Sequence, residues 1–193
     1  MKFYAVKNGR KTGIFQTWEE CKEYVEGFPA AKYKSFKTEA DAKDYLNDVD
    51  KYEIDKDVPT AYVDGSFNSA NLEYSFGAIL LINGEKYIFK KKFKSDEYSF
   101  ARNVAGEVRG ASFIINYAIK KKLKTLDLFY DYQGIESWYT GEWKANNTLT
   151  QRYQEFAKSN KDIIKVNFHK VKSHTGVKYN EEVDQLAKEA LGI

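Results

Sequence analysis

Four carboxylates stand out from the 28 Asp and Glu residues of the chain by their sequence context. Asp64 ends a short apolar strand pattern, and Asp131 ends another. Glu107 lies near the start of an amphipathic helical pattern, and Asp184 lies on a second such pattern near the end of the sequence. Carboxylates that meet at neighbouring strand ends raise each other's pKa and cost free energy unless a cation compensates them.

A divalent metal ion is the usual compensation for such a cluster. Carboxylate oxygens favour Mg²⁺ or Mn²⁺, and one Cys and two His leave few ligands for zinc. Two ions about 3.5–4 Å apart activate a water and stabilise the leaving oxygen in an in-line phosphodiester cleavage. Each carboxylate taken alone is better explained as a helix cap or a surface charge, and it is the joint pattern that favours the metal site.

The elements that must position these carboxylates follow from hydrophobic periodicity. A hairpin signal at Asn83-Gly84 joins two of the expected strands, and the pattern from 104 to 122 predicts a helix with one apolar face. The expected strands are 61–63, 76–82, 87–93, 126–130 and 163–171, and the expected helices are 104–122, 149–159 and 180–191. This order indicates an α/β fold, in the α+β sense of a mixed sheet with helices on its faces, over residues 59–193.

The first 46 residues predict a separate small ββαβα domain. Its expected strands are 2–6, 13–16 and 32–36, and its expected helices are 18–27 and 39–46. Thr17, followed by Glu20 three residues later, is typical of a helix N-cap. Residues 47–58 are acidic and lack the periodicity of a core element, so we interpret them as a linker.

Composition bounds the function classes. The chain has 193 residues, 42% of them hydrophobic and 31% charged, which excludes a disordered or collagen-like protein. The net charge is only +3, but residues 1–37 hold eight Lys or Arg and four Glu, so the charge excess is concentrated there. A single Cys, no apolar run near 18 residues and an early polar N-terminus predict a cytoplasmic protein without a membrane span or signal peptide.

Residues 60–191 resemble type 1 ribonuclease H through five blocks in the family's order. The blocks are YVDGS at 62–66, NVAGE at 103–107, FYDYQ at 129–133, SHTG at 173–176 and NEEVDQLA at 180–187. The resemblance implies a ribonuclease H-like fold. It also implies an endonuclease that cleaves the RNA strand of RNA/DNA hybrids with two Mg²⁺ ions, Mn²⁺ being a substitute, and leaves 5′-phosphate and 3′-hydroxyl ends. The implied metal ligands are the four carboxylates Asp64, Glu107, Asp131 and Asp184, and His174 would shuttle protons or assist product release.

The same resemblance implies contacts with the nucleic acid. Asn103 and Gln133 match positions that reach the minor groove, where an amide can read the 2′-hydroxyl. Ser66 and Asn68 are further candidates, with Asn71 as the alternative to Asn68, because the alignment after Ser66 is not unique. Arg102 matches a phosphate contact, or else it is a solvated surface residue.

The N-terminal segment resembles the hybrid-binding domain that is shared with caulimovirus viroplasmin proteins. The matching stretches are FYAVKNGRKTGIF at 3–15, Thr17-Trp18, FPAA at 28–31 and YKSF at 33–36. The resemblance implies that rings pack on DNA-strand sugars, that a lysine contacts a phosphate and that backbone N–H groups approach RNA 2′-hydroxyls. The residues implied are Tyr4, Trp18, Tyr33, Lys34 and Ala30. Ser35 stands where many relatives have a second Lys.

Three functions remain open at this point. The first is the nuclease, and the second is a catalytically idle protein that binds RNA/DNA hybrid or double-stranded RNA through the N-terminal domain. The third, a polynucleotidyl transferase acting on DNA, is disfavoured because the last block ends in His174 and Asp184. We expect an RNA/DNA hybrid as partner and no obligate protein partner. Residues 131–174 leave no room for a long basic insertion, so substrate capture would fall to the N-terminal domain. Lysines 90–92 either contact phosphates along the nucleic acid or keep an exposed strand edge soluble.

Overall fold

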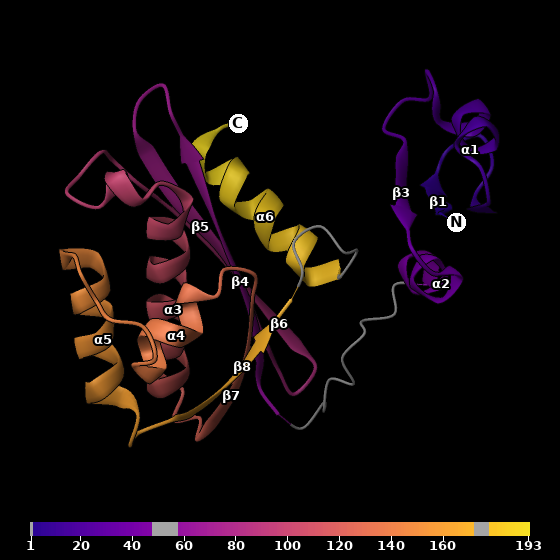
Figure 1. The fold of residues 1–193 in the computed structure, drawn as a ribbon. Coiled ribbons are helices and arrows are strands. Elements are labelled where there is room, and N and C mark those ends of the chain that lie inside the picture. Colours follow the sequence, from indigo (N-terminus) through magenta and orange to yellow (C-terminus); the bar gives the residue numbers. More distant parts are fainter. Residues whose placement is uncertain (1, 48–57, 172–177) are drawn as a thin grey trace. The chain divides into compact units, whose positions relative to one another are not determined.

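A computed structural model describes residues 2–47, 58–171 and 178–193, which form two compact units. One unit contains a three-stranded sheet and the other a five-stranded sheet (Figure 1). Within the described ranges, no helix has both the length and the apolar composition needed to cross a bilayer.

The N-terminal unit has the expected ββαβα order. Its elements are β1 (Phe3–Asn8), β2 (Gly13–Phe15), α1 (Trp18–Val25), β3 (Lys32–Phe36) and α2 (Glu39–Asn47). β1 is the central strand and pairs antiparallel with both neighbours. Because successive side chains alternate between the faces of a strand, Ala5 packs with Ala42 of α2 and Val6 packs with Cys21 of α1. The Thr17 hydroxyl accepts the N–H of Glu20 at 3.3 Å, which confirms the predicted N-cap.

The larger unit confirms the mixed sheet. Its strands are β4 (Thr60–Asn68), β5 (Glu73–Ile82), β6 (Glu85–Phe93), β7 (Thr125–Tyr130) and β8 (Lys165–Lys170), in the order β6-β5-β4-β7-β8. Its helices are the 3₁₀ turn η1 (Ser99–Ala101), α3 (Asn103–Lys120), α4 (Gly134–Thr140), α5 (Thr148–Asn160) and α6 (Lys178–Leu191). β4, β7 and β8 are parallel, and the other pairs are antiparallel. The short helix α4 was not predicted.

Asp64 does not end its strand, as the sequence pattern had suggested. β4 continues to Asn68 because β5 pairs with it antiparallel over its whole length, with Asp64 opposite Gly77. The parallel pairing with β7 stops earlier, at Tyr62 opposite Phe129. Asp64 therefore lies just beyond the parallel section of the sheet, where β7 also ends, and this brings it near Asp131.

Two helices approach β5 closely from opposite faces. α3, α4 and α5 cover one face of the sheet and α6 covers the other (Figure 1). A Cβ added to Gly106 of α3 would lie 1.9 Å from the carbonyl oxygen of Ser75, and one added to Gly77 would lie 2.2 Å from that of Val183 in α6. The Ser75 hydroxyl also donates to the carbonyl oxygen of Ala187 at 2.6 Å. These contacts fix the two helices that carry Glu107 and Asp184.

Three of the four lysines of β6 are paired with carboxylates, and Lys91 lies over the Phe93 ring. Lys86 forms an ion pair with Glu182, Lys90 contacts Glu189 at 3.0 Å, and Lys92 contacts Glu73 of β5 at 3.1 Å. Two of these three pairs join β6 to α6. The pairing favours a structural role for these lysines over phosphate binding.

Candidate active site

Three carboxylates from separate elements converge at one end of the sheet. Asp64 comes from β4, Glu107 from the second turn of α3, and Asp131 directly follows β7. Each offers one oxygen, and these oxygens lie within 4.8 Å of one another. Glu107 is 2% exposed, whereas Asp64 and Asp131 are half-buried. This proximity requires either protonation or a cation.

Asp184 lies beside this group on α6. It is half-buried, and its Oδ2 accepts from the Lys188 ammonium at 2.7 Å. The described residues that line the pocket between these groups are Asp64, Gly65, Asn103, Asp131, Asn180, Glu181 and Asp184. The fourth predicted carboxylate therefore shares a pocket with the first and third.

The electrostatics follow from burial and repulsion. Burial, followed by the charge of Asp131, raises the pKa of Asp64 from 3.8 to about 7, although the Gly65 N–H, which donates to its Oδ1 at 2.7 Å, acts in the opposite direction. Burial and the charges of Asp131 and Asp64 raise the pKa of Glu107 well above its ordinary value. The site is therefore strained when all of its carboxylates are ionised.

The donor set suits a hard divalent cation. Carboxylate oxygens on three rigid elements surround a space that opens to solvent, and the described cluster contains neither sulfur nor imidazole. Oxygen ligands of this kind match Mg²⁺ and Mn²⁺. A bound cation would also remove the repulsion that raises the pKa values of Asp64 and Glu107.

Asn103 lies at the edge of the pocket, where α3 begins, and Arg102 precedes it outside the pocket lining. Asn103 is exposed, lines the pocket and donates from Nδ2 to Glu107 Oε1 at 3.1 Å. Arg102 is also exposed, and its φ of 54° is unusual for a residue other than glycine. The helix start thus presents the Asn103 amide at the edge of the carboxylate cluster.

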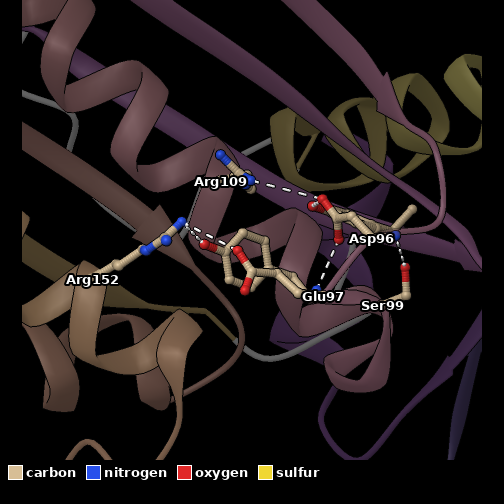
Figure 2. A network of polar contacts seen from close by, with 7 residues as sticks. Asp96, Glu97, Ser99, Arg109 and Arg152 are labelled. Atoms are coloured by element: carbon tan, nitrogen blue, oxygen red, sulfur yellow. Dashed lines mark hydrogen bonds and ion pairs between the residues drawn. The ribbon is translucent and has the colours of Figure 1, made fainter.

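A polar network fixes the segment that leads into α3 (Figure 2). Asp96 accepts the Tyr74 hydroxyl of β5 at 2.9 Å and lies 3.9 Å from the guanidinium of Arg109 on α3. Arg152 of α5 pairs with Glu97 at 3.3 Å and also donates to the Tyr98 hydroxyl. Three elements of the domain therefore restrain the chain just before Arg102 and Asn103.

The other predicted contacts in this unit lie outside the pocket lining. Gln133 precedes α4, and its Nε2 donates to Glu136 Oε2 and Ser137 Oγ, both at 3.2 Å. Ser66 is 8% exposed within β4. Asn68 ends that strand, and its Oδ1 accepts the N–H of Ala70 at 2.9 Å, while Asn71 binds Glu73 through both its amide nitrogen and its amide oxygen. His174 lies outside the described residues.

In the N-terminal unit, the predicted aromatic residues form one row. Trp18 lies between Tyr4 and Tyr33, with ring centroids 5.8 and 5.6 Å away. Trp18 is 36% exposed and Tyr33 is 44% exposed. Lys34 is half-buried on β3. Ala30 is exposed with a φ of 55°, and its carbonyl oxygen accepts from Asn8 Nδ2 at 2.8 Å.

Asn180 is a pocket residue that had no role in the sequence prediction. Asn180 lines the carboxylate pocket and is 5% exposed, and among the described residues its Oδ1 has no hydrogen-bond partner. It lies four residues before Asp184 on α6. That helical spacing was visible in the sequence and could have pointed to it.

Comparison with known proteins agrees with this arrangement. Residues 2–46 match the family described as Ribonuclease H1 N-terminal domain, and residues 56–192 match the RNase H family. The chain is 60% identical to Homo sapiens ribonuclease H1 over 40 residues, which are 21% of this chain and only 14% of that relative. It is 32% identical to the ribonuclease H of Pseudoalteromonas translucida over 143 residues, which cover 68% of this chain and 88% of that one.

Solved structures support the fold assignment. The crystal structure of RNase H1 from Halobacterium salinarum aligns with a TM-score of 0.56 and 23% identity, over 69% of this chain and 96% of that one. The larger unit is therefore a ribonuclease H-like fold. With the RNase H match over residues 56–192, the chain belongs to the ribonuclease H family.

Proposed function

We propose that this protein is an endonuclease that hydrolyses the RNA strand of RNA/DNA hybrids with two divalent ions, Mg²⁺ or in its place Mn²⁺. The observation that carries the proposal is the convergence of Asp64, Glu107 and Asp131 within 4.8 Å, with Asp184 in the same pocket. The RNase H family match over residues 56–192 supports a catalytic role for this cluster.

Each carboxylate has a role that its position supports. Asp64 lies near both Asp131 and Asp184, whose charges each affect its pKa, so it would contact both ions. Glu107 and Asp131 would hold one ion, and Asp184 the other. Such ions, when bound, lower the pKa of an attacking water and stabilise the leaving oxygen. The water oxygen bonds to phosphorus and gives up a proton as the bond to the 3′-oxygen breaks, and the 3′-oxygen takes up a proton, which leaves a 5′-phosphate and a 3′-hydroxyl.

Substrate selection would combine both units. Asn103 lines the pocket, where its amide would reach a 2′-hydroxyl, and the exposed Arg102 beside it in the sequence would contact a phosphate. The exposed rings of Trp18 and Tyr33 would pack against the DNA strand of the hybrid. We assign His174 the role of proton shuttle on the strength of its motif.

The test separates cleavage from binding. Wild-type protein and Asp64→Asn are incubated with a labelled hybrid in Mg²⁺, and hybrid affinity is measured in parallel. We expect the substitution to abolish cleavage and to preserve or strengthen binding, because it removes a metal ligand and one negative charge. Wild-type protein that binds the hybrid but leaves its RNA intact at enzyme excess would instead identify an idle binding protein.

A further inference from the structure

Asn180 is a buried polar residue that the proposed roles do not explain. It lies in the first turn of α6, one helical turn before Asp184, so the two side chains share a face. Both line the carboxylate pocket. The spacing places an amide next to a carboxylate that already contributes to the site.

The Oδ1 atom of Asn180 lacks the hydrogen bond that burial normally demands. The residue is 5% exposed, and Oδ1 has no partner within the described part of the chain. Nearly all buried polar atoms in proteins are hydrogen-bonded, so an exception calls for a ligand or a functional reason. An unsatisfied oxygen that lines an acidic pocket is a candidate cation ligand.

The two proposed ion positions differ in the number of carboxylates beside them. Asp64, Glu107 and Asp131 form one close group, and Asp184 lies outside it. The ion beside Asp184 would therefore have two carboxylates, those of Asp64 and Asp184, and one Asp184 oxygen already contacts Lys188 at 2.7 Å. This position therefore has fewer carboxylate ligands than the position beside Asp64, Glu107 and Asp131.

We propose that Asn180 Oδ1 is a ligand of the divalent ion held between Asp64 and Asp184, an inference that rests on the proposed two-ion function. An amide oxygen is a hard, neutral donor that Mg²⁺ and Mn²⁺ both accept. It completes the oxygen set without adding a fifth negative charge to a site that already repels its own carboxylates.

The test uses the full chain and two substitutions. Asn180→Leu keeps the approximate shape and removes the oxygen, whereas Asn180→Asp keeps an oxygen and adds a charge. Thermal unfolding is measured in EDTA and at saturating Mg²⁺, and Mn²⁺ binding is counted by electron paramagnetic resonance. Asn160→Leu is the matched control, because its amide donates to the Phe156 carbonyl oxygen at 2.7 Å on α5, outside the pocket lining.

The expected effect of Asn180→Leu on stability differs with and without metal. In EDTA, Asn180→Leu should unfold at a higher temperature than wild type, because it removes an unpaired buried oxygen. With Mg²⁺ the stabilisation should shrink, and the affinity for the Mn²⁺ ion between Asp64 and Asp184 should fall about tenfold. Asn180→Asp should bind that ion more tightly. Asn160→Leu should lower the unfolding temperature in both conditions and leave Mn²⁺ affinity unchanged.

The outcomes also separate this inference from the proposed function. Suppose that wild type binds two ions and cleaves the hybrid, while Asn180→Leu is destabilised in EDTA and binds Mn²⁺ as tightly as wild type. The ligand role of Asn180 is then wrong, and the nuclease proposal stands. If Asn180→Leu fails to fold, unchanged Mn²⁺ affinity in Asn180→Asp overturns the ligand role by itself. A wild-type chain that neither binds the ions nor cleaves the hybrid would overturn both.

Discussion

At the scale of single residues, the acidic site stores repulsion that a cation relieves. The burial of Asp64 and Glu107 serves no purpose for stability, since both carboxyl groups have raised pKa values in the folded chain. Natural proteins keep such destabilising clusters where function requires them. The free energy of unfolding should therefore be measurably lower when metal is removed.

The first prediction concerns the pH dependence of the metal-free chain. The fold raises the pKa of Asp64 from 3.8 to about 7, so between these values the folded state keeps a proton that the unfolded state releases. Stability is thus greatest below about pH 4 for this group and is lost as the pH rises to about 7. In EDTA at pH 8, Asp64→Asn should raise the free energy of unfolding by about 2–4 kcal/mol. Urea unfolding at several pH values measures this.

Two results bear on that prediction. Added Mg²⁺ should flatten the wild-type curve between pH 4 and 7, because a cation stabilises the ionised carboxylates. If instead wild type and Asp64→Asn lose stability in parallel across this pH range in EDTA, the repulsion among the carboxylates is weaker than burial and proximity imply.

At the scale of elements, α6 is held by a close backbone contact and by surface ion pairs. The backbone contact should contribute more to stability than the ion pairs. A Cβ on Gly77 would lie 2.2 Å from the carbonyl oxygen of Val183. We predict that Gly77→Ala displaces α6, costs about 1–3 kcal/mol, and lowers Mg²⁺ affinity because Asp184 moves with the helix. Calorimetric titration with Mg²⁺ and urea unfolding provide the two measurements.

The control for Gly77 is Gly84 in the β5–β6 turn. A Cβ there meets no atom within 4 Å, but its φ of 82° penalises alanine. Gly84→Ala should therefore cost about 1 kcal/mol and leave Mg²⁺ affinity unchanged. Equal effects of the two substitutions on Mg²⁺ would show that α6 packing does not position Asp184.

The ion pairs of β6 give a different prediction. Lys90 and Glu189 are both nearly half exposed, and such pairs contribute at most about 1 kcal/mol. Lys90→Ala should change stability by less than this and leave the salt dependence of hybrid binding unaltered. Lys34→Ala in the N-terminal unit should reduce that slope by about 0.9. A reduced slope for Lys90→Ala would restore the phosphate-binding interpretation of lysines 90–92.

Hydrophobic periodicity was sufficient for most elements, and its failures have physical causes. Asp64 looked like a strand end because its local pattern turns polar, but antiparallel pairing with β5, a long-range contact, extends β4 to Asn68. The seven residues of α4 carry too little periodicity to be detected. Glu107 and Asp131 were found through spacing and family blocks. The four-residue spacing of Asn180 and Asp184 was visible in the sequence, but the unpaired Oδ1 of Asn180 depends on the packing of α6 and could not be predicted.

At the scale of the whole molecule, the near-neutral net charge is the sum of a basic segment and an acidic site. The excess of Lys and Arg lies in residues 1–37, and the four predicted metal-binding carboxylates lie at the pocket of the larger unit. We predict that Trp18→Ala weakens hybrid binding by about 1–3 kcal/mol and raises KM while kcat is preserved, because its exposed ring lies in the other unit. Steady-state kinetics on a hybrid would test this, and a lower kcat at saturating substrate would contradict it.

The most direct test of the central claim maps cleavage on a hybrid labelled separately on its RNA and DNA strands. With Mg²⁺, the wild-type chain should cut the RNA strand internally, leave 5′-phosphate and 3′-hydroxyl ends and spare the DNA strand, while Asp64→Asn should leave both strands intact. RNA that stays full-length at enzyme excess, or wild-type cleavage that persists in Asp64→Asn, would contradict the account.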